Sequence, residues 1–253
     1  MLTQNYPFCS YPLLHQDILW ASARHLSNQL ADPTKCRELL GISDAEPNDD
    51  NPHPLQQRTL LELGAGCAVP SLVAMKRGAK AVVATDLDDA NRIRSIAEAM
   101  QRNTFDGSIK ARAHPFRWEE PDMITGCAQV LRELLDESNS DASKEDTAAP
   151  LPTFDVICAT DCLFIIHLHE HLIRTLDELL NPNGGVAIFC FCIHASYSKA
   201  EQVWGFVDKV RDFKPNGSAV FEIETLPSVQ CTPPKLGMPS EQGLVHTLRI
   251  RKV

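Results

Sequence analysis

The sequence lacks an excess of positive charge. Its 253 residues carry 24 Lys and Arg against 33 Asp and Glu, which gives a formal net charge of −9 and a pI near 5.4. A protein that binds nucleic acid through a basic face needs the opposite balance, so we expect no nucleic-acid partner. The negative charge instead suits a basic partner, such as a lysine-bearing protein segment.

The sequence also lacks an apolar run approaching the ~20 residues of a membrane span. Its start, MLTQNYPFCSYPLL, has neither a basic beginning nor a long apolar stretch, so we expect no secretory signal and no membrane partner. Nine cysteines are present without a C-x-x-C pair, which favours free thiols in a reducing compartment over a metal site or disulfides. We expect a cytoplasmic monomer, with the nucleus as the alternative location.

The composition predicts one globular domain over residues 1–253. Hydrophobic residues make up 43% and charged residues 23%, which is ordinary for a folded protein. We expect a helical extension over about 1–42. Two polar segments, 43–57 and 136–152, predict flexible surface loops that contribute nothing to the core.

Strand and helix patterns alternate through the rest of the chain. Two last strands, 219–226 and 244–253, follow without a helical pattern between them and predict an antiparallel pair. The alternation predicts an α/β fold, a Rossmann-like doubly wound sheet that is mostly parallel. Ligands bind off the carboxyl ends of such strands. The predicted strands before that pair are 59–63, 81–86, 108–118, 154–161 and 186–193, and the helices are 70–78, 88–103, 123–135, 169–180 and 198–213.

The stretch TLLELGAGCAVPSL, residues 59–72, joins a strand to a helix through Gly64 and Gly66. It differs from a dinucleotide-binding loop because Glu62 precedes the glycines and Val69 stands where the third glycine belongs. Glu62 would repel a pyrophosphate, but it favours the cationic end of S-adenosylmethionine. The carboxylate of that cofactor can use the free N–H groups of the loop, and the glycines allow close backbone approach.

Asp86 ends the next predicted strand, twenty-four residues after Glu62. This position suits hydrogen bonds to the ribose hydroxyls of a cofactor. The glycines alone leave open a bare turn that binds no ligand. The joint pattern of Glu62, Gly64, Gly66 and Asp86 favours S-adenosylmethionine.

Several segments resemble one enzyme family. LELGAGCAVPSLVAMKRGAKAVVATDLDD (61–89) resembles the first two motifs of seven-strand S-adenosylmethionine-dependent methyltransferases. Within that family the chain is similar to the non-histone protein lysine methyltransferases: ILWASARHL (18–26) resembles their N-terminal Trp-Ala helix, FRWEE (116–120) their tryptophan after the third strand, and ATDCLF (159–164) their D-x-x-[YF] motif. The branch it resembles is that of the elongation-factor-1-alpha N-terminal and lysine methyltransferases, once labelled nicotinamide N-methyltransferase-like. The resemblance covers about 14–213.

The resemblance implies a set of cofactor contacts. Trp20 would close over the cofactor and Trp118 would pack on its adenine, with plain core packing as the alternative for both. Ala68 departs from the family, because it replaces the last glycine of G-x-G-x-G; its methyl group is tolerated if the cofactor does not press there. The implied cofactor-binding residues are Trp20, Glu62, Gly64, Ala65, Gly66, Asp86, Leu87, Trp118 and Thr160.

Asp161 and Phe164 are the predicted catalytic residues. Asp161 directly follows an all-apolar strand, where an unpaired carboxylate costs several kcal/mol, so we expect it to orient a substrate amine. The alternative is that it caps the following segment. Phe164 would wall the acceptor channel, and it stands where the family commonly has tyrosine, so it offers no phenol hydroxyl.

Histidines provide two further candidates. His167, His169 and His171 diverge in a helix and cannot close on one ion, so we expect no metal. His194 follows the fifth strand, where both a substrate-side role and a solvated loop position are open.

The predicted function is S-adenosylmethionine-dependent N-methylation of a protein lysine or N-terminal amine, and the resemblance points to elongation factor 1-alpha as acceptor. The alternatives are N-methylation of a small molecule such as nicotinamide, and a catalytically silent cofactor-binding scaffold.

Overall fold

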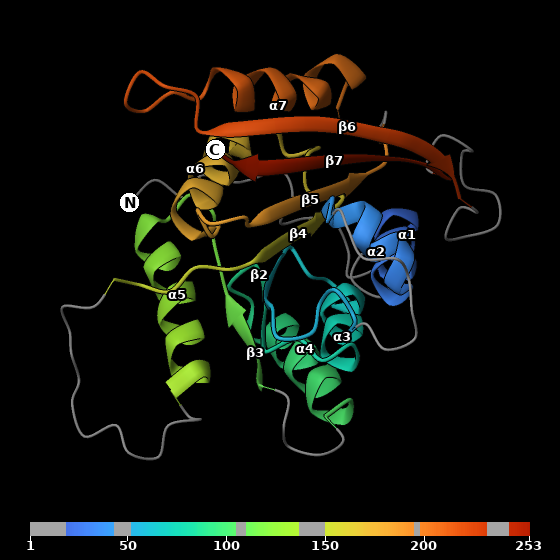
Figure 1. Ribbon diagram of the computed structural model, residues 1–253, viewed down its shortest axis with the longest axis vertical. Coiled ribbons are helices and arrows are strands. Elements are labelled where there is room, and N and C mark those ends of the chain that lie inside the picture. Colours follow the sequence, from blue (N-terminus) through green and yellow to red (C-terminus); the bar gives the residue numbers. More distant parts are fainter. Residues whose placement is uncertain (1–18, 43–51, 105–109, 137–149, 195–197, 232–242) are drawn as a thin grey trace.

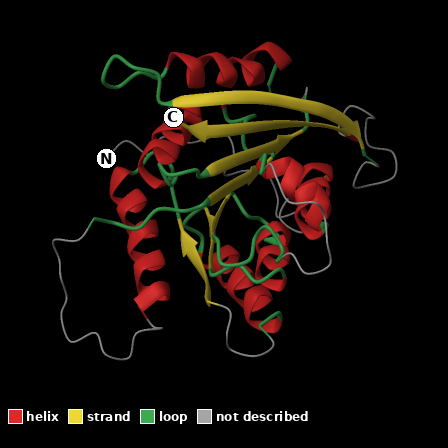
Figure 2. Cartoon of the chain, viewed as in Figure 1, coloured by secondary structure: helices red, strands yellow, loops and turns green. Residues whose placement is uncertain are grey.

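The computed structural model describes residues 19–42, 52–104, 110–136, 150–194, 198–231 and 243–253. Over these residues a seven-stranded sheet carries helices on both faces (Figure 1 and Figure 2). The strand order is β3-β2-β1-β4-β5-β7-β6. The first five strands in this order pair in parallel, and β7 runs antiparallel to both β5 and β6. The predicted fold class, including the closing antiparallel pair, is confirmed.

The central strands are apolar because helices cover them on both sides, as expected for parallel strands. Every residue of β1, β2 and β5 is buried, whereas the edge strand β3 is only half-buried and more polar. The strands are β1 (Thr59–Leu63), β2 (Ala81–Asp86), β3 (Lys110–Pro115), β4 (Val156–Thr160), β5 (Val186–Phe191), β6 (Phe221–Gln230) and β7 (Leu244–Lys252).

Two separate cores fill the two faces of the sheet. Side chains alternate along a strand, so Leu60 packs in one core while Leu61 and Leu63 pack in the other. The core containing Leu60 is covered by α1 (Ala21–Ala31), α2 (Pro33–Leu40), α3 (Val69–Lys76) and α4 (Ala90–Arg102); the other is covered by α5 (Pro121–Asp136), α6 (His169–Leu179) and α7 (Ala200–Asp212), with the short 3₁₀ helix η3 (Ile166–Leu168) before α6 (Figure 1).

Helices form where the sequence pattern predicts them. In α6 the apolar residues recur at helical spacing, and Leu172, Ile173 and Leu176 are all at most 2% exposed. In α4, Asp89 is the N-cap residue, and its Oδ1 accepts hydrogen bonds from the backbone N–H groups of Asn91 and Arg92. Helices α1 and α2 account for the described part of the predicted N-terminal extension.

One loop prediction is wrong in part. Leu55, inside the segment 43–57, is 0% exposed and belongs to the core that α1 to α4 cover. The turn that holds it is tied to β1 and to α3, since Arg58 N donates to Leu55 O and Gln57 N donates to Gly78 O. A single leucine in a polar window gives too weak a periodic signal to be recognised as core. In the second predicted loop, Asp136 is instead the last residue of α5, and 150–152 form neither helix nor strand. The predicted loop residues 43–51 and 137–149 lie outside the described residues.

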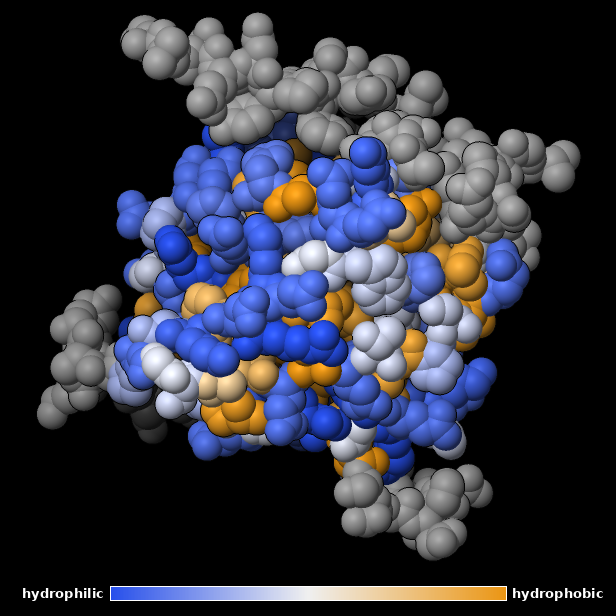
Figure 3. All heavy atoms as spheres, turned by 90° about the horizontal axis from the view of Figure 1, so that it is seen from above, coloured by the Kyte–Doolittle hydropathy of each residue, from blue (hydrophilic) through white to orange (hydrophobic). Residues whose placement is uncertain are grey.

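The face formed by α7 and β6 is largely hydrophilic, with scattered hydrophobic residues (Figure 3). Among the helices that the structure describes, none combines the length and the apolar character needed to cross a membrane.

Candidate functional site

The glycine loop after β1 adopts a backbone that favours glycine. Gly64, Gly66 and Ala68 have φ values of +63°, +52° and +53°. A Cβ on Gly64 would lie 2.8 Å from Cys162 Sγ and 3.5 Å from the ring of Trp118, so both space and conformation require glycine. A Cβ on Gly66 would meet nothing within 4 Å, so the loop opens onto free space there.

Ala68 shows why the family pattern has glycine at its position. The residue is the N-cap of α3 and lies in the left-handed region, which costs a non-glycine residue roughly 1–2 kcal/mol. The strain comes from the backbone alone and is present whether or not a cofactor presses on the methyl group.

Glu62 lies inside the protein, behind this loop. Its side chain is 0% exposed, and Oε2 accepts hydrogen bonds from the backbone N (3.0 Å) and the hydroxyl of Ser71, in the first turn of α3. Oε1 has no hydrogen-bond partner among the described residues. Burial raises the pKa of Glu62 to about 8; the Ser71 hydrogen bonds act in the opposite direction, and the charge of Asp86 adds to the rise.

Asp86 joins the glycine loop to α4. Oδ2 accepts from Gly66 N at 2.7 Å, while Oδ1 accepts from Leu87 N at 2.8 Å and from Arg92 Nη1 at 2.6 Å. Leu87, directly after it, is 53% exposed. The predicted contacts Gly66, Asp86 and Leu87 therefore do lie together. Arg92 was missed by the sequence reasoning, although its place in the first turn after a strand-ending carboxylate could have indicated it.

Cys162 connects this half of the site with the end of β4. Its Sγ donates to Leu63 O and to Thr160 O, both at 3.4 Å, and it packs beside Gly64. Trp118, 9% exposed, packs next to the same glycine. Among the predicted cofactor contacts, Ala65 is also largely buried, and its N donates to Thr85 O at 2.8 Å.

The carboxylate of Asp161 is hydrogen-bonded, and its backbone lies in the left-handed region with a φ of +51°. Oδ1 accepts from Cys192 N at 2.8 Å and contacts His194 Nε2 at 3.1 Å, and Oδ2 accepts from the hydroxyl of Ser22 at the start of α1. These partners compensate its burial, so burial alone no longer argues for a catalytic role. Its assignment as a catalytic residue stays a prediction. Ser22 was missed because it lies 139 residues away in sequence.

Aromatic rings surround His194. The ring of Trp20 lies 5.2 Å and that of Phe164 6.1 Å from the imidazole, both nearly perpendicular to it. His194 is 4% exposed, which excludes the alternative of a solvated loop histidine. The structure thus brings Trp20, Asp161, Phe164 and His194 together. Trp20 contacts His194 in this cluster, and its predicted closure over the cofactor stays a prediction.

The histidine-rich segment has a different environment. His169 is fully buried, and its Nε2 lies 2.7 Å from Leu163 O. Across the described ranges there is no group of three His, Cys, Asp or Glu side chains arranged to hold a metal ion.

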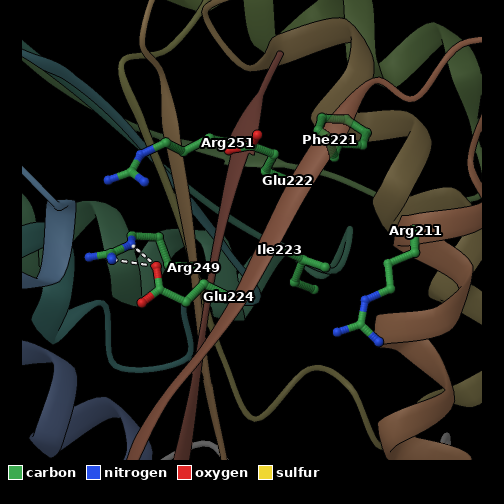
Figure 4. A pocket seen from close by; sticks show the side chains of 7 residues that line it. All are labelled: Arg211, Phe221, Glu222, Ile223, Glu224, Arg249 and Arg251. Atoms are coloured by element: carbon green, nitrogen blue, oxygen red, sulfur yellow. Dashed lines mark hydrogen bonds and ion pairs between the residues drawn. The ribbon is translucent and has the colours of Figure 1, made fainter.

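A groove of about 350 Å³ lies elsewhere, at the β6 edge. Arg249 and Arg251 pair with Ile188 and Val186 in the β-sheet, which places the groove toward the amino-terminal end of β5, away from the glycine loop. Figure 4 shows Arg249 bonded to Glu224 within it. The lining residues are Arg211, Phe221, Glu222, Ile223, Glu224, Arg249 and Arg251.

Comparisons with known proteins agree with the resemblance read from the sequence. A family model described as "Ribosomal protein L11 methyltransferase (PrmA)" matches residues 51–149. Proteins named "Protein N-terminal and lysine N-methyltransferase EFM7" are 28% identical over 144 residues in Kluyveromyces lactis, 26% over 209 in Schizosaccharomyces pombe and 31% over 159 in Candida albicans. These matches cover 57%, 81% and 62% of this chain, and 52%, 72% and 56% of the relatives. The chain thus spans about half of two of these relatives.

The solved structures agree at the level of the fold. The crystal structure of SMU.776 complexed with SAH superposes with a TM-score of 0.53 at 15% identity, over 93% of this chain and 50% of that one. A second structure, described as a SAM-dependent methyltransferase from Streptococcus mutans, gives 0.52 at 16% identity, over 93% and 50%. The chain therefore has the seven-strand fold of S-adenosylmethionine-dependent methyltransferases and is a homologue of the proteins named protein N-terminal and lysine N-methyltransferase EFM7.

Proposed function

We propose that this chain is an S-adenosylmethionine-dependent N-methyltransferase that modifies a lysine or N-terminal amine of a protein. The observation that carries the proposal is that two half-sites meet at the carboxyl ends of the parallel strands, where Cys162 joins them. The cofactor half comprises Glu62, the glycine loop and Asp86, and the acceptor half comprises Asp161 with its aromatic surroundings. The names of the homologues support a protein amine as acceptor.

The residues of the cofactor half suit S-adenosylmethionine. Glu62 Oε1 is a buried oxygen with no hydrogen-bond partner among the described residues, so this oxygen is available to interact with a positive charge. Gly66 faces open space, where a ligand can approach the backbone of the loop closely. The exposed Leu87 beside Asp86 offers an apolar contact for a flat base next to a carboxylate that accepts hydroxyl hydrogen bonds.

When bound, S-adenosylmethionine supplies a methyl group on a positively charged sulfur. The chain's own task is to present an uncharged amine in line with that methyl group, and positioning of this kind is worth ~7–11 kcal/mol. Asp161 is fixed by Ser22, Cys192 N and His194, so its charge is preorganised to attract and orient the amine. The rings of Trp20 and Phe164 exclude water from the same place.

The identity of the acceptor is a finer proposal. Elongation factor 1-alpha is the first acceptor to test, because the branch that the sequence resembles acts on it. A monomer in the cytoplasm, with the nucleus as the alternative, stays a prediction.

The test is incubation of the purified protein with radiolabelled S-adenosylmethionine and a lysate of its own cell. Label in a protein band, retained after acid hydrolysis as methyl-lysine or an N-methylated first residue, is the expected result. Label in a small metabolite would favour the small-molecule alternative. Absence of transfer, with S-adenosylhomocysteine still bound in calorimetry, would overturn the enzyme in favour of the silent scaffold.

A further inference from the structure

Glu62 is a buried carboxyl group, and no cation lies beside it among the residues that the structure describes. Asp86, on the neighbouring strand, has the Arg92 guanidinium at 2.6 Å. Among the described residues Glu62 has only the neutral donors of Ser71, on one oxygen. Its other oxygen faces no donor there. Two carboxyl groups therefore lie near one loop, and within the described part of the chain only Asp86 has a counter-ion.

Among the described groups that face Glu62, the hydrogen bonds of Ser71 favour the ionised carboxylate, but burial outweighs them and the charge of Asp86 adds to the effect of burial. Ser71 of α3 is neutral, Asp86 of β2 is negative, and the thiols of Cys158 on β4 and Cys162 after β4 are buried, which raises their pKa well above the usual value and keeps them uncharged. An ionised carboxylate in a dry site without a partner costs several kcal/mol. A proton on the carboxyl group avoids that cost, in line with the raised pKa of Glu62.

We propose that Glu62 makes the cofactor site selective for positive charge by proton exchange: its carboxyl group holds a proton in the free protein and releases it to solvent when the cationic methyl donor binds. This inference rests on the proposed function, because it takes S-adenosylmethionine as the ligand. The charge balances, since one proton leaves the site and one sulfonium enters. The product of transfer, S-adenosylhomocysteine, has an uncharged thioether and leaves the proton on Glu62.

The exchange predicts how the two ligands compete. Below about pH 8, the pKa of Glu62, the donor must displace a proton before it gains its counter-ion, and above that pH it need not. The affinity for S-adenosylmethionine relative to S-adenosylhomocysteine therefore rises with pH, by up to about tenfold per pH unit, and levels off above about pH 8. The α-amino group, which both ligands share, cancels in this ratio.

Titration calorimetry of each ligand in phosphate and in Tris at pH 7 tests the inference without turnover. The two buffers differ in ionisation enthalpy, so the difference in apparent binding heat counts the protons released. The expected result is release of close to one proton more with S-adenosylmethionine than with S-adenosylhomocysteine. Glu62→Gln, which keeps the shape of the protonated carboxyl group, should abolish that difference and make the affinity ratio independent of pH.

Asp86→Asn is the matched control, because it changes the neighbouring carboxylate that has a counter-ion. It should weaken both ligands by a similar factor, since both carry the ribose, and should preserve the difference in proton release. Equal proton release with both ligands in the wild-type protein would overturn the inference and leave the proposed function standing. Failure of both ligands to bind would overturn the proposed function itself. Should Glu62→Gln not fold, the wild-type buffer comparison decides alone.

Discussion

After strands β1 and β2, the site is made from residues that are close in sequence. Glu62, Gly66, Asp86 and Arg92 lie within one strand–helix–strand–helix unit, and the hydrogen bond from Gly66 N to Asp86 spans only 20 residues. After strands β4 and β5, Asp161 contacts His194, 33 residues away in sequence, and Ser22, 139 residues away. One half is thus a local motif, whereas the other exists only once α1 has docked on the sheet.

Because the two halves are built differently, we expect them to serve different roles. A local unit keeps its geometry through short connections, which suits tight binding of a constant cofactor. A half-site built from distant segments depends on the docking of α1, and its geometry can change without disturbing the glycine loop. Substitutions in one half should therefore leave the other half's measured property unchanged.

The largest effect is expected at the distant half. Asp161→Asn removes the charge that we propose orients the amine while keeping the shape, so turnover should fall by ~10²–10³. Single-turnover methylation measures the loss, and calorimetry with S-adenosylhomocysteine should show unchanged affinity. Ser22→Ala is the control, because it removes a hydrogen bond to Asp161 but keeps the charge, and should cost far less turnover. Wild-type turnover in Asp161→Asn would reduce Asp161 to a structural cap.

The corresponding change in the local half is Asp86→Ala. It should weaken S-adenosylhomocysteine by about 1–3 kcal/mol, because the ribose acceptor is lost and the partners of Asp86 are released. Asp88→Ala, at an exposed position two residues on, should leave the affinity unaltered. If Asp86→Ala binds as tightly as wild type, Asp86 does not belong to the cofactor site.

A smaller effect is expected on the stability of the free protein. Because burial raises the pKa of Glu62 from 4.5 to about 8, the folded protein holds a proton that the unfolded chain releases within that window. This contribution to stability is fully present below pH 4.5 and is lost as the pH rises toward about 8. Melting temperatures of wild type and Glu62→Gln should diverge over this range, with the melting temperature of the wild type falling faster as the pH rises. Parallel curves would contradict a protonated Glu62.

The smallest effect concerns Ala68. Glycine there relieves roughly 1–2 kcal/mol of left-handed strain but loses about as much to the entropy of the unfolded chain. Ala68→Gly should therefore change the free energy of unfolding by less than ~1 kcal/mol, as measured by urea denaturation. Ala68→Val, which cannot adopt this backbone cheaply, should be clearly destabilising. Equal stability of the two variants would argue against a left-handed Ala68.

The sequence by itself determined the order of strands and helices, the parallel sheet with its antiparallel closing pair, and the local half of the site. Periodicity reports which face of an element is buried, and glycines at a strand-to-helix turn report a backbone that other residues resist. Both signals lie within a few residues, so a single chain displays them. Glu62, Gly66 and Asp86 lie close together because they stand at the ends of neighbouring parallel strands, which the same alternation predicts.

Only the tertiary structure decided the partners of Asp161, the burial of His194 and the place of Leu55 in the core. The Ser22 hydrogen bond and the contact of the Trp20 ring with His194 depend on how α1 docks on the sheet, and Leu55 reaches the core only when the elements around it assemble. Docking is governed by packed side-chain surfaces, which no short-range pattern encodes. The counter-ion of Asp86 is likewise set by side-chain directions in space, as is the lack of a cation beside Glu62 among the described residues. We infer that these directions decide which of the two carboxyl groups keeps its proton.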